Sequence, residues 1–180
     1  MKKILLLVMS LFLVAQVGVA TAGKAANWEI SMMPKATAEE QELLKWSFIL
    51  ENDYGVYAYN PSTIAFTKNE DGSKNLELVT AEIKTIFTNT EALKKINAGY
   101  AEKLKKGDQT AYCTLQMVFN LQANTYANTA IKVVSGKGKI LEERKIQAIF
   151  APIPEQSFAE AMLEIINKYL VENREELLLN

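Results

Sequence analysis

Histidine is absent from this 180-residue sequence, and cysteine occurs only once, at Cys113. Without histidine the chain has neither a Ser-His nor a Cys-His nucleophile pair, and no imidazole that could bind a metal ion. A single cysteine cannot form an intrachain disulfide, so the hydrophobic core must hold the fold together by itself. We therefore expect a protein that is not an enzyme, with no catalytic residues, no metal site and no cofactor.

Long apolar runs are also scarce, and the one that stands out lies at the N-terminus. Residues 1–22 begin with Lys2 and Lys3, continue with an apolar stretch over 4–14, and end in the small-residue pattern Ala20-Thr21-Ala22. These features predict a signal peptide that is removed after Ala22, and hence a protein exported to the periplasm or the cell exterior. The apolar stretch is too short for a membrane anchor, and no later run is long enough to span a bilayer.

Neither sign of charge dominates the composition. The chain has 20 lysines and arginines against 21 aspartates and glutamates, a net charge of −1 that becomes −3 when Lys2 and Lys3 leave with the signal peptide. These charges argue against nucleic acid or an anionic membrane as a partner. The remaining 158 residues suffice for one domain, which we place at 46–174, between an N-terminal extension at 23–45 and a C-terminal tail at 175–180.

Apolar residues that alternate with polar ones, separated by turn residues, predict an antiparallel sheet. In the first hairpin Trp46, Phe48 and Leu50 share one side, and Gly55 in the turn at 52–55 is free to take a positive φ. A second turn at 60–63 separates strand 56–59 from a short extended piece at 64–66. The remaining strands are predicted at 76–87, 110–121, 125–135 and 139–150.

Two longer segments have apolar residues at helical spacing, and each begins with a capping box. Ser157 and Glu160 begin a helix that runs to about residue 170 with a broad apolar face, and Thr88 begins a narrower helix that Gly107 ends. A short helix is also predicted over 37–45. We therefore predict an α+β fold of about six antiparallel strands, with one helix inserted between strands 3 and 4 and a C-terminal helix packed on the sheet.

Several short motifs along this predicted fold fit one known family. They are Trp46, the run Gly-Val-Tyr-Ala-Tyr-Asn at 55–60, Ser62 and Ile64, the strand 76–84, Tyr112-Cys113, the hairpin through 136–138, Pro152-Ile153-Pro154 and the segment 157–160. With them the chain resembles the surface-adhesin E-like family of exported bacterial proteins over about residues 46–169. The resemblance implies a six-stranded sheet under a C-terminal helix, the ability to dimerise, and a namesake that binds host surface and matrix proteins.

The chain departs from that family at three points. Asn60 replaces the aspartate of a Tyr-Asp turn, Cys113 lacks a partner for the disulfide that often ties the terminal helix to the sheet, and the lipid-anchor cysteine is missing. The expected fold is unaffected by these changes. No binding residue can be carried over one by one, so the adhesin function does not follow from the resemblance alone.

The aromatic residues of the first hairpin are one candidate binding surface. Tyr54, Tyr57 and Tyr59 lie there with Trp46, and tyrosine and tryptophan are enriched at interfaces. Tyr57 and Tyr59 share one side of their strand, so either they or their neighbours face the core. The alternative is ordinary cross-strand packing of these rings.

Lysines in the last turns of the inserted helix are the second candidate surface, at Lys103, Lys105 and Lys106, and Lys94 and Lys95 lie earlier in the same predicted helix. If the fold brings them near the basic residues of the last hairpin, together they would meet a polyanion such as a surface polysaccharide. The alternative is a solvated helix face and an edge strand protected from pairing by its charges. The basic residues of that hairpin are Lys137, Lys139, Arg144 and Lys145.

Cys113 shares one side of its predicted strand with three large apolar residues, which predicts a buried structural thiol. An intermolecular disulfide and a reactive thiol are the alternatives. Its neighbours on that side are Leu115, Met117 and Phe119.

Taken together, these features predict an exported, non-enzymatic binding protein of the bacterial envelope or surface, adhesin-like, with a protein or a surface polymer as its partner. A periplasmic small-ligand-binding domain and an uncharacterised enzyme are the alternatives. We also expect a homodimer, since Ile49, Tyr112 and Val118 give the second face of the sheet an apolar character. The alternative is that the extension at 23–45 covers that face, with Trp28 as its anchor.

Overall fold

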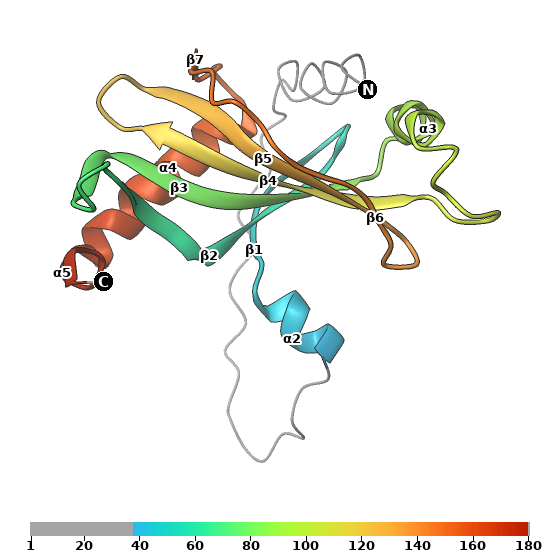
Figure 1. The fold of residues 1–180 in the computed structure, drawn as a ribbon, viewed down its shortest axis with the longest axis horizontal. Coiled ribbons are helices and arrows are strands. Elements are labelled where there is room, and N and C mark those ends of the chain that lie inside the picture. The colour runs from blue at the N-terminus through green and yellow to red at the C-terminus, as the bar shows by residue number, and fades with distance from the viewer. Residues whose placement is uncertain (1–37, 180) are drawn as a thin grey trace.

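The computed structural model describes residues 38–179. The predicted signal peptide and most of the N-terminal extension lie outside these residues. The predicted α+β fold is confirmed: an antiparallel sheet in the order β1-β2-β3-β4-β5-β6, with a helix between β3 and β4 and a C-terminal helix (Figure 1). A seventh, two-residue strand pairs with β5. No helix in this part of the chain is long and apolar enough to cross a membrane.

The elements follow the chain in a simple order. The strands are β1 (Ser47–Asn52), β2 (Gly55–Lys68), β3 (Lys74–Phe87), β4 (Thr110–Asn120), β5 (Thr125–Ser135), β6 (Ile140–Lys145) and β7 (Ala151–Pro152). The helices are α2 (Ala38–Leu44), α3 (Thr90–Gly99), α4 (Phe158–Glu172) and α5 (Arg174–Leu179).

One face of the sheet, the core face, is buried under α4. Alternate residues of the central strands supply it, as predicted, and they include Val79 and Met117, both fully buried. From α4 come Phe158, Met162 and Ile166, and the Phe158 ring stacks on Tyr57 of β2 with centroids 5.0 Å apart. Ile96 of α3 joins the same cluster, so both helices contribute to one face.

Helix α4 begins with the predicted cap. Ser157 Oγ accepts a hydrogen bond from the backbone N–H of Glu160 at 3.2 Å, and the Glu160 carboxylate accepts one from the N–H of Gln156 at 2.6 Å. The glutamate thus reaches back one residue further than in the usual capping box. The cap fixes the start of the helix where Phe158 meets Tyr57.

Strand β1 contains a bulge that the sequence pattern does not reveal. Phe48 pairs with Ala58 and Leu50 with Tyr57, so Ile49 is an extra residue. Leu50 is buried, whereas Phe48 lies on the other face and is 61 % exposed. The prediction that Phe48 and Leu50 share one side was wrong, because one inserted residue reverses the alternation. Ile49 itself packs against the core.

Strand β2 is continuous through the predicted turn at 60–63. Asn60 pairs with Glu82 and Ala65 already pairs with Thr80, so the intervening residues bulge from the strand. The two predicted pieces are one strand because Thr63 Oγ1 accepts a hydrogen bond from the backbone N–H of Glu82 at 2.8 Å and keeps β3 attached.

Gly55 is needed because a side chain has no room at this position. Its φ is not positive, so its backbone conformation does not require glycine. A Cβ atom at this position would lie 2.3 Å from the carbonyl oxygen of Ile86. The predicted reason for this glycine was therefore wrong: the close approach of β3 excludes a side chain.

Helix α3 is shorter than predicted at both ends. Its N-cap is Asn89 and not Thr88, because Asn89 Oδ1 accepts a hydrogen bond from the N–H of Ala92 at 2.9 Å. The helix ends at Gly99, well before Gly107. Tyr100 is the C-cap residue, its N–H donates to the Asn97 carbonyl, and its hydroxyl donates to Glu142 of β6.

Of the predicted strand at 139–150 only β6, at 140–145, is a strand, and the two-residue β7 lies just beyond the predicted end. An extra residue in β5, Thr129, produces a bulge opposite β4. The N–H of Ile146 donates to the Thr129 carbonyl at 2.7 Å, after which the chain leaves the sheet until Ala151 pairs with Tyr126. The bulge bends β5 there, so one straight partner strand cannot follow it. The short helix α5 covers most of the segment named as a C-terminal tail, 175–180.

Replacing Ile166 by alanine should destabilise the protein by about 2–5 kcal/mol. The side chain lies on the buried side of α4 and is 0 % exposed, so its loss leaves a cavity. Urea unfolding measures the difference. Ile165→Ala, at a half-buried neighbour, is the control and should cost less. An equal or larger cost at Ile165 would contradict the orientation of α4 described above.

Candidate functional site

The face of the sheet opposite α4, here called the open face, carries two polar rows. Paired residues of adjacent antiparallel strands point to the same side, so the register defines each row. The first row runs Lys84, Thr114, Lys132 and Glu143 across β3, β4, β5 and β6. The second row runs Glu82, Gln116, Ala130 and Lys145 across the same strands.

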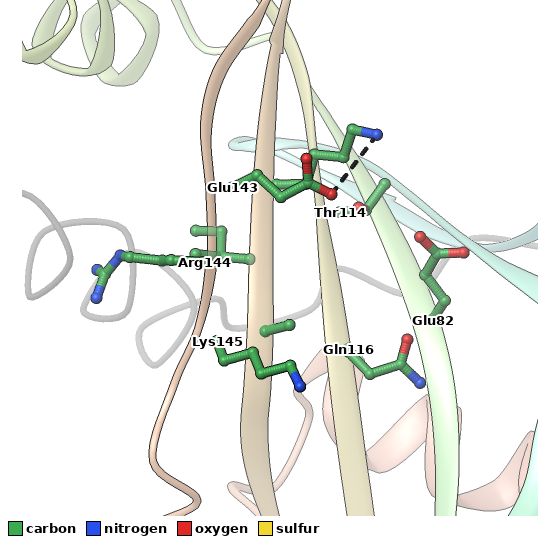
Figure 2. A pocket seen from close by; sticks show the side chains of 9 residues that line it. Glu82, Thr114, Gln116, Glu143, Arg144 and Lys145 are labelled. Carbon is green, nitrogen blue, oxygen red and sulfur yellow. Dashed lines mark ion pairs between the residues drawn. The ribbon is translucent and has the colours of Figure 1, made fainter.

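An open groove of about 500 Å³ lies between these rows. Figure 2 shows Glu82, Thr114, Gln116, Glu143 and Lys145 lining it, whereas Arg144 extends away on the other side of β6. Neighbouring strands are about 4.8 Å apart, so the groove extends over about 14 Å from β3 to β6. It is therefore a wide polar depression on the sheet and not a closed cavity.

Small and fixed side chains shape the groove floor. Ala130 has only a methyl group between Gln116 and Lys145, which leaves space above it. The Gln116 amide donates a hydrogen bond to Thr80 Oγ1 and is held in place. The bulge residue Thr129 adds a hydrogen bond from its hydroxyl to the Gln116 carbonyl at 3.1 Å.

Both signs of charge occur in the groove. Lys132 and Glu143 form an exposed ion pair with a separation of 3.9 Å. Glu82 and Lys145, at opposite ends of the second row, pair with no charged group among the described residues. A ligand lying along this row would meet a carboxylate at one end and an ammonium group at the other.

Lys84 stands beside the groove but is enclosed by aromatic rings. Its Nζ lies 4.7 Å from the ring centroid of Trp46 and 4.2 Å from that of Tyr112. Burial lowers the pKa of Lys84, while the negative charges of Glu42 and Glu82 act in the other direction. The two cation–π contacts stabilise the lysine where it has little water around it. This residue therefore fixes the β1 end of the open face.

The three tyrosines predicted as a binding surface are not equally accessible. Tyr57 is 1 % exposed and stacks on Phe158, so it offers no surface to a partner. Burial raises the pKa of Tyr57 to about 12. Tyr59 is half-buried against the core, and Tyr54 is half-buried in the first hairpin turn. Tyr57 is therefore a core residue whose ring packs against helix α4.

The structure brings the lysines after α3 together with part of the last hairpin. Lys139 Nζ donates to the Lys103 carbonyl at 2.8 Å, and Lys103 Nζ donates to the Leu141 carbonyl at 2.6 Å. Lys105 and Lys106 lie exposed in the same loop. Arg144 and Lys145 do not join them, since Arg144 bonds to Glu142 and Lys145 lines the groove.

The groove residues were missed as a site, although the alternation of β4 correctly predicts Thr114 and Gln116 on the face opposite Cys113. The only sign of the groove in the sequence was that several predicted strands place polar residues on the face opposite the core. It could not be recognised in one strand at a time, because the rows exist only after four strands are paired in register.

The buried environment of Cys113 agrees with the predicted structural thiol. The side chain is 1 % exposed, and burial raises the pKa of its thiol to about 12. A thiol so far from ionisation is a poor nucleophile at neutral pH. Among the described residues, no group of three carboxylate or thiol side chains is placed to hold a metal ion.

A network of three side chains joins the end of α3 to β6. The Tyr100 hydroxyl donates to one oxygen of Glu142, and Arg144 Nε donates to the other. Burial alone would raise the pKa of Glu142, but the hydrogen bonds from Tyr100 and Arg144 outweigh it and the pKa is lowered. Burial and Glu142 together raise the pKa of Tyr100.

Glu142→Gln should destabilise the protein most near neutral pH, and the difference should vanish in acid. A carboxyl group with a lowered folded-state pKa stabilises the fold above its unfolded value, 4.5 here, and loses that contribution as the pH falls through the folded-state pKa. Urea unfolding of both proteins at several pH values measures this. A difference that stays constant down to strongly acidic pH would show that the charge of Glu142 is not what stabilises β6.

With this geometry in view, comparison with known proteins identifies no relative: no family model, no curated protein and no solved structure matches the chain.

Proposed function

We propose that this chain is an exported, non-enzymatic binding protein of the bacterial envelope or surface, adhesin-like, and that the open-face groove holds its partner. The observation that carries the proposal is the contrast between the two faces of one sheet. Fully buried side chains fill the face under α4, whereas the other face presents an open polar groove assembled from four strands. The signal-peptide pattern of residues 1–22 supports the exported location.

The arrangement of the groove supports binding over catalysis. Its two carboxylates, Glu82 and Glu143, stand on β3 and β6, with two strands between them and Cα atoms on the order of 14 Å apart. The nearest thiol, Cys113, is buried on the other face.

The polarity of the groove also favours a macromolecular partner over a small ligand. Small-ligand sites are mostly apolar and enclose their ligand, whereas this groove is open and five of its nine lining residues carry a charge. An extended segment of another protein fits an open groove with a carboxylate at one end and an ammonium group at the other. Exposed apolar residues flank it, Ile86 on β3 and Ile140 on β6.

Replacing Ala130 by tryptophan should abolish partner capture, because the indole would fill the floor of the groove. The purified protein and this variant are compared in pull-downs from envelope extract and from host matrix proteins. Lys145→Glu, which reverses the charge at one end, should weaken the same bound species. Ala123→Trp, in the exposed turn between β4 and β5, is the matched control.

Capture of the same proteins by Ala130→Trp and by the control would refute the groove as the binding site. Equal urea-unfolding midpoints for the variants would establish that the fold is intact. If the unmodified protein captures nothing from either source, the binding function itself fails.

We also propose that the protein forms a homodimer, now through the edge strand β1. Leu43, Leu44 and Phe48 lie close together in the chain at this edge and are all strongly exposed. A second copy would cover this apolar surface and pair the open edge of β1.

Light scattering over a wide concentration range should give the mass of two chains, and Phe48→Ser should shift the protein toward the monomer. A single-chain mass at every concentration would contradict the dimer. Ile149→Ser, at an exposed apolar residue far along the chain, is the control that should leave the mass unchanged.

A further inference from the structure

Five exposed lysines from two separate segments form one surface, here called the lysine patch. Three come from the loop that follows α3 and two from the turn between β5 and β6. None of them forms an ion pair with a carboxylate in residues 38–179. The five residues are Lys103, Lys105, Lys106, Lys137 and Lys139.

Hydrogen bonds fix the two segments against each other. Besides the bonds of Lys103 and Lys139 already described, the N–H of Gly136 donates to the Gln109 carbonyl at 2.7 Å. The N–H of Lys137 donates to Asp108 Oδ1 at 3.3 Å. The backbones that carry the lysines are therefore held in place before any partner arrives, which lowers the entropy lost on binding.

The patch is positive although the protein as a whole is not. Its two segments contain five lysines against two carboxylates, Glu102 and Asp108, in a chain of net charge −1. Asp108 also accepts hydrogen bonds from the N–H groups of Gln109 and Lys137. The nearby Glu142 is occupied by Tyr100 and Arg144. A polyanion would thus be attracted here and repelled by much of the remaining surface.

The side chains around the patch favour one class of polyanion. The aromatic ring nearest in sequence, Tyr100, is buried and hydrogen-bonded, so it is not available for stacking on nucleic-acid bases. Ile140 is the one large exposed apolar side chain beside the lysines in the chain, too little to insert into a lipid surface. We propose that the lysine patch binds a linear polysaccharide that carries sulfate or carboxylate groups.

This surface uses none of the groove residues, so it is a second binding site and does not rest on the function proposed for the groove. The lysines fit such a polymer because each is a flexible point charge with three donors, suited to anionic groups at irregular spacing. Lys103 and Lys139 each use one donor to join the segments. Lys105, Lys106 and Lys137 make no such bond among the described residues and are the better positions for a test.

Binding of the purified protein to heparin, used as the sulfated probe, tests the proposal at physiological salt. The triple variant Lys105→Gln, Lys106→Gln, Lys137→Gln should bind about a hundredfold more weakly, if each lysine contributes as it does at an anionic surface. The matched control changes three exposed lysines in other segments, Lys45, Lys68 and Lys168, to glutamine and should bind as the unmodified protein does. Arginine at the three patch positions should retain binding.

Three results would overturn the proposal. They are no binding of the unmodified protein to heparin, an equal loss in the control triple variant, and tighter binding to phosphatidylglycerol vesicles or to duplex DNA than to heparin. The urea-unfolding midpoints of all variants should agree. If the midpoint of the triple variant is lowered, the single change Lys106→Gln takes its place, and it should also weaken binding to heparin.

Discussion

Phe158, the first residue of α4, stacks on Tyr57 of β2 with the two rings 8° from parallel, and the buried side of the helix continues into the core through Met162 and Ile166. A sheet without disulfides needs such a cover for one face, and here the C-terminal helix provides it. The cap at Ser157 sets where the helix begins and so aligns Phe158 with Tyr57. The difference between the two faces follows from this packing, because α4 covers only one face and leaves the other to solvent.

That opposite face is specialised by irregularities in the sheet. The bulge at Ile49 moves Phe48 to the exposed side at the edge, and the bulge at Thr129 bends β5 beside the groove. Each adds one residue to a strand and changes which side chains face solvent. Lys84 between Trp46 and Tyr112 closes the β1 end with cation–π contacts. The groove is therefore a product of how the strands are distorted as much as of their composition.

Strand β6 divides its charged residues between two tasks. Glu143 and Lys145 point to the open face and line the groove, whereas Glu142 and Arg144 belong to the other side and anchor Tyr100. That anchor holds the loop after α3 against the sheet, and Lys103 and Lys139 add their own bonds to it. The lysine patch thus depends on contacts between segments almost forty residues apart in the chain, while the groove depends on the pairing of four strands.

Local patterns determined the main elements: the alternation of β4 separates Cys113 from Thr114, and Ser157 with Glu160 marks the start of α4, since these signals need only near neighbours in the chain. The positions of the bulges, the early end of α3 at Gly99 and the caged Lys84 were decided by the tertiary structure alone. The rings around Lys84 come from two other segments, the Thr129 bulge is bonded to Gln116 and Ile146, and Tyr100 after α3 is bonded to Glu142 of β6. The groove belongs to this second group, because strand register, which no single strand encodes, is what aligns Glu82, Gln116 and Lys145.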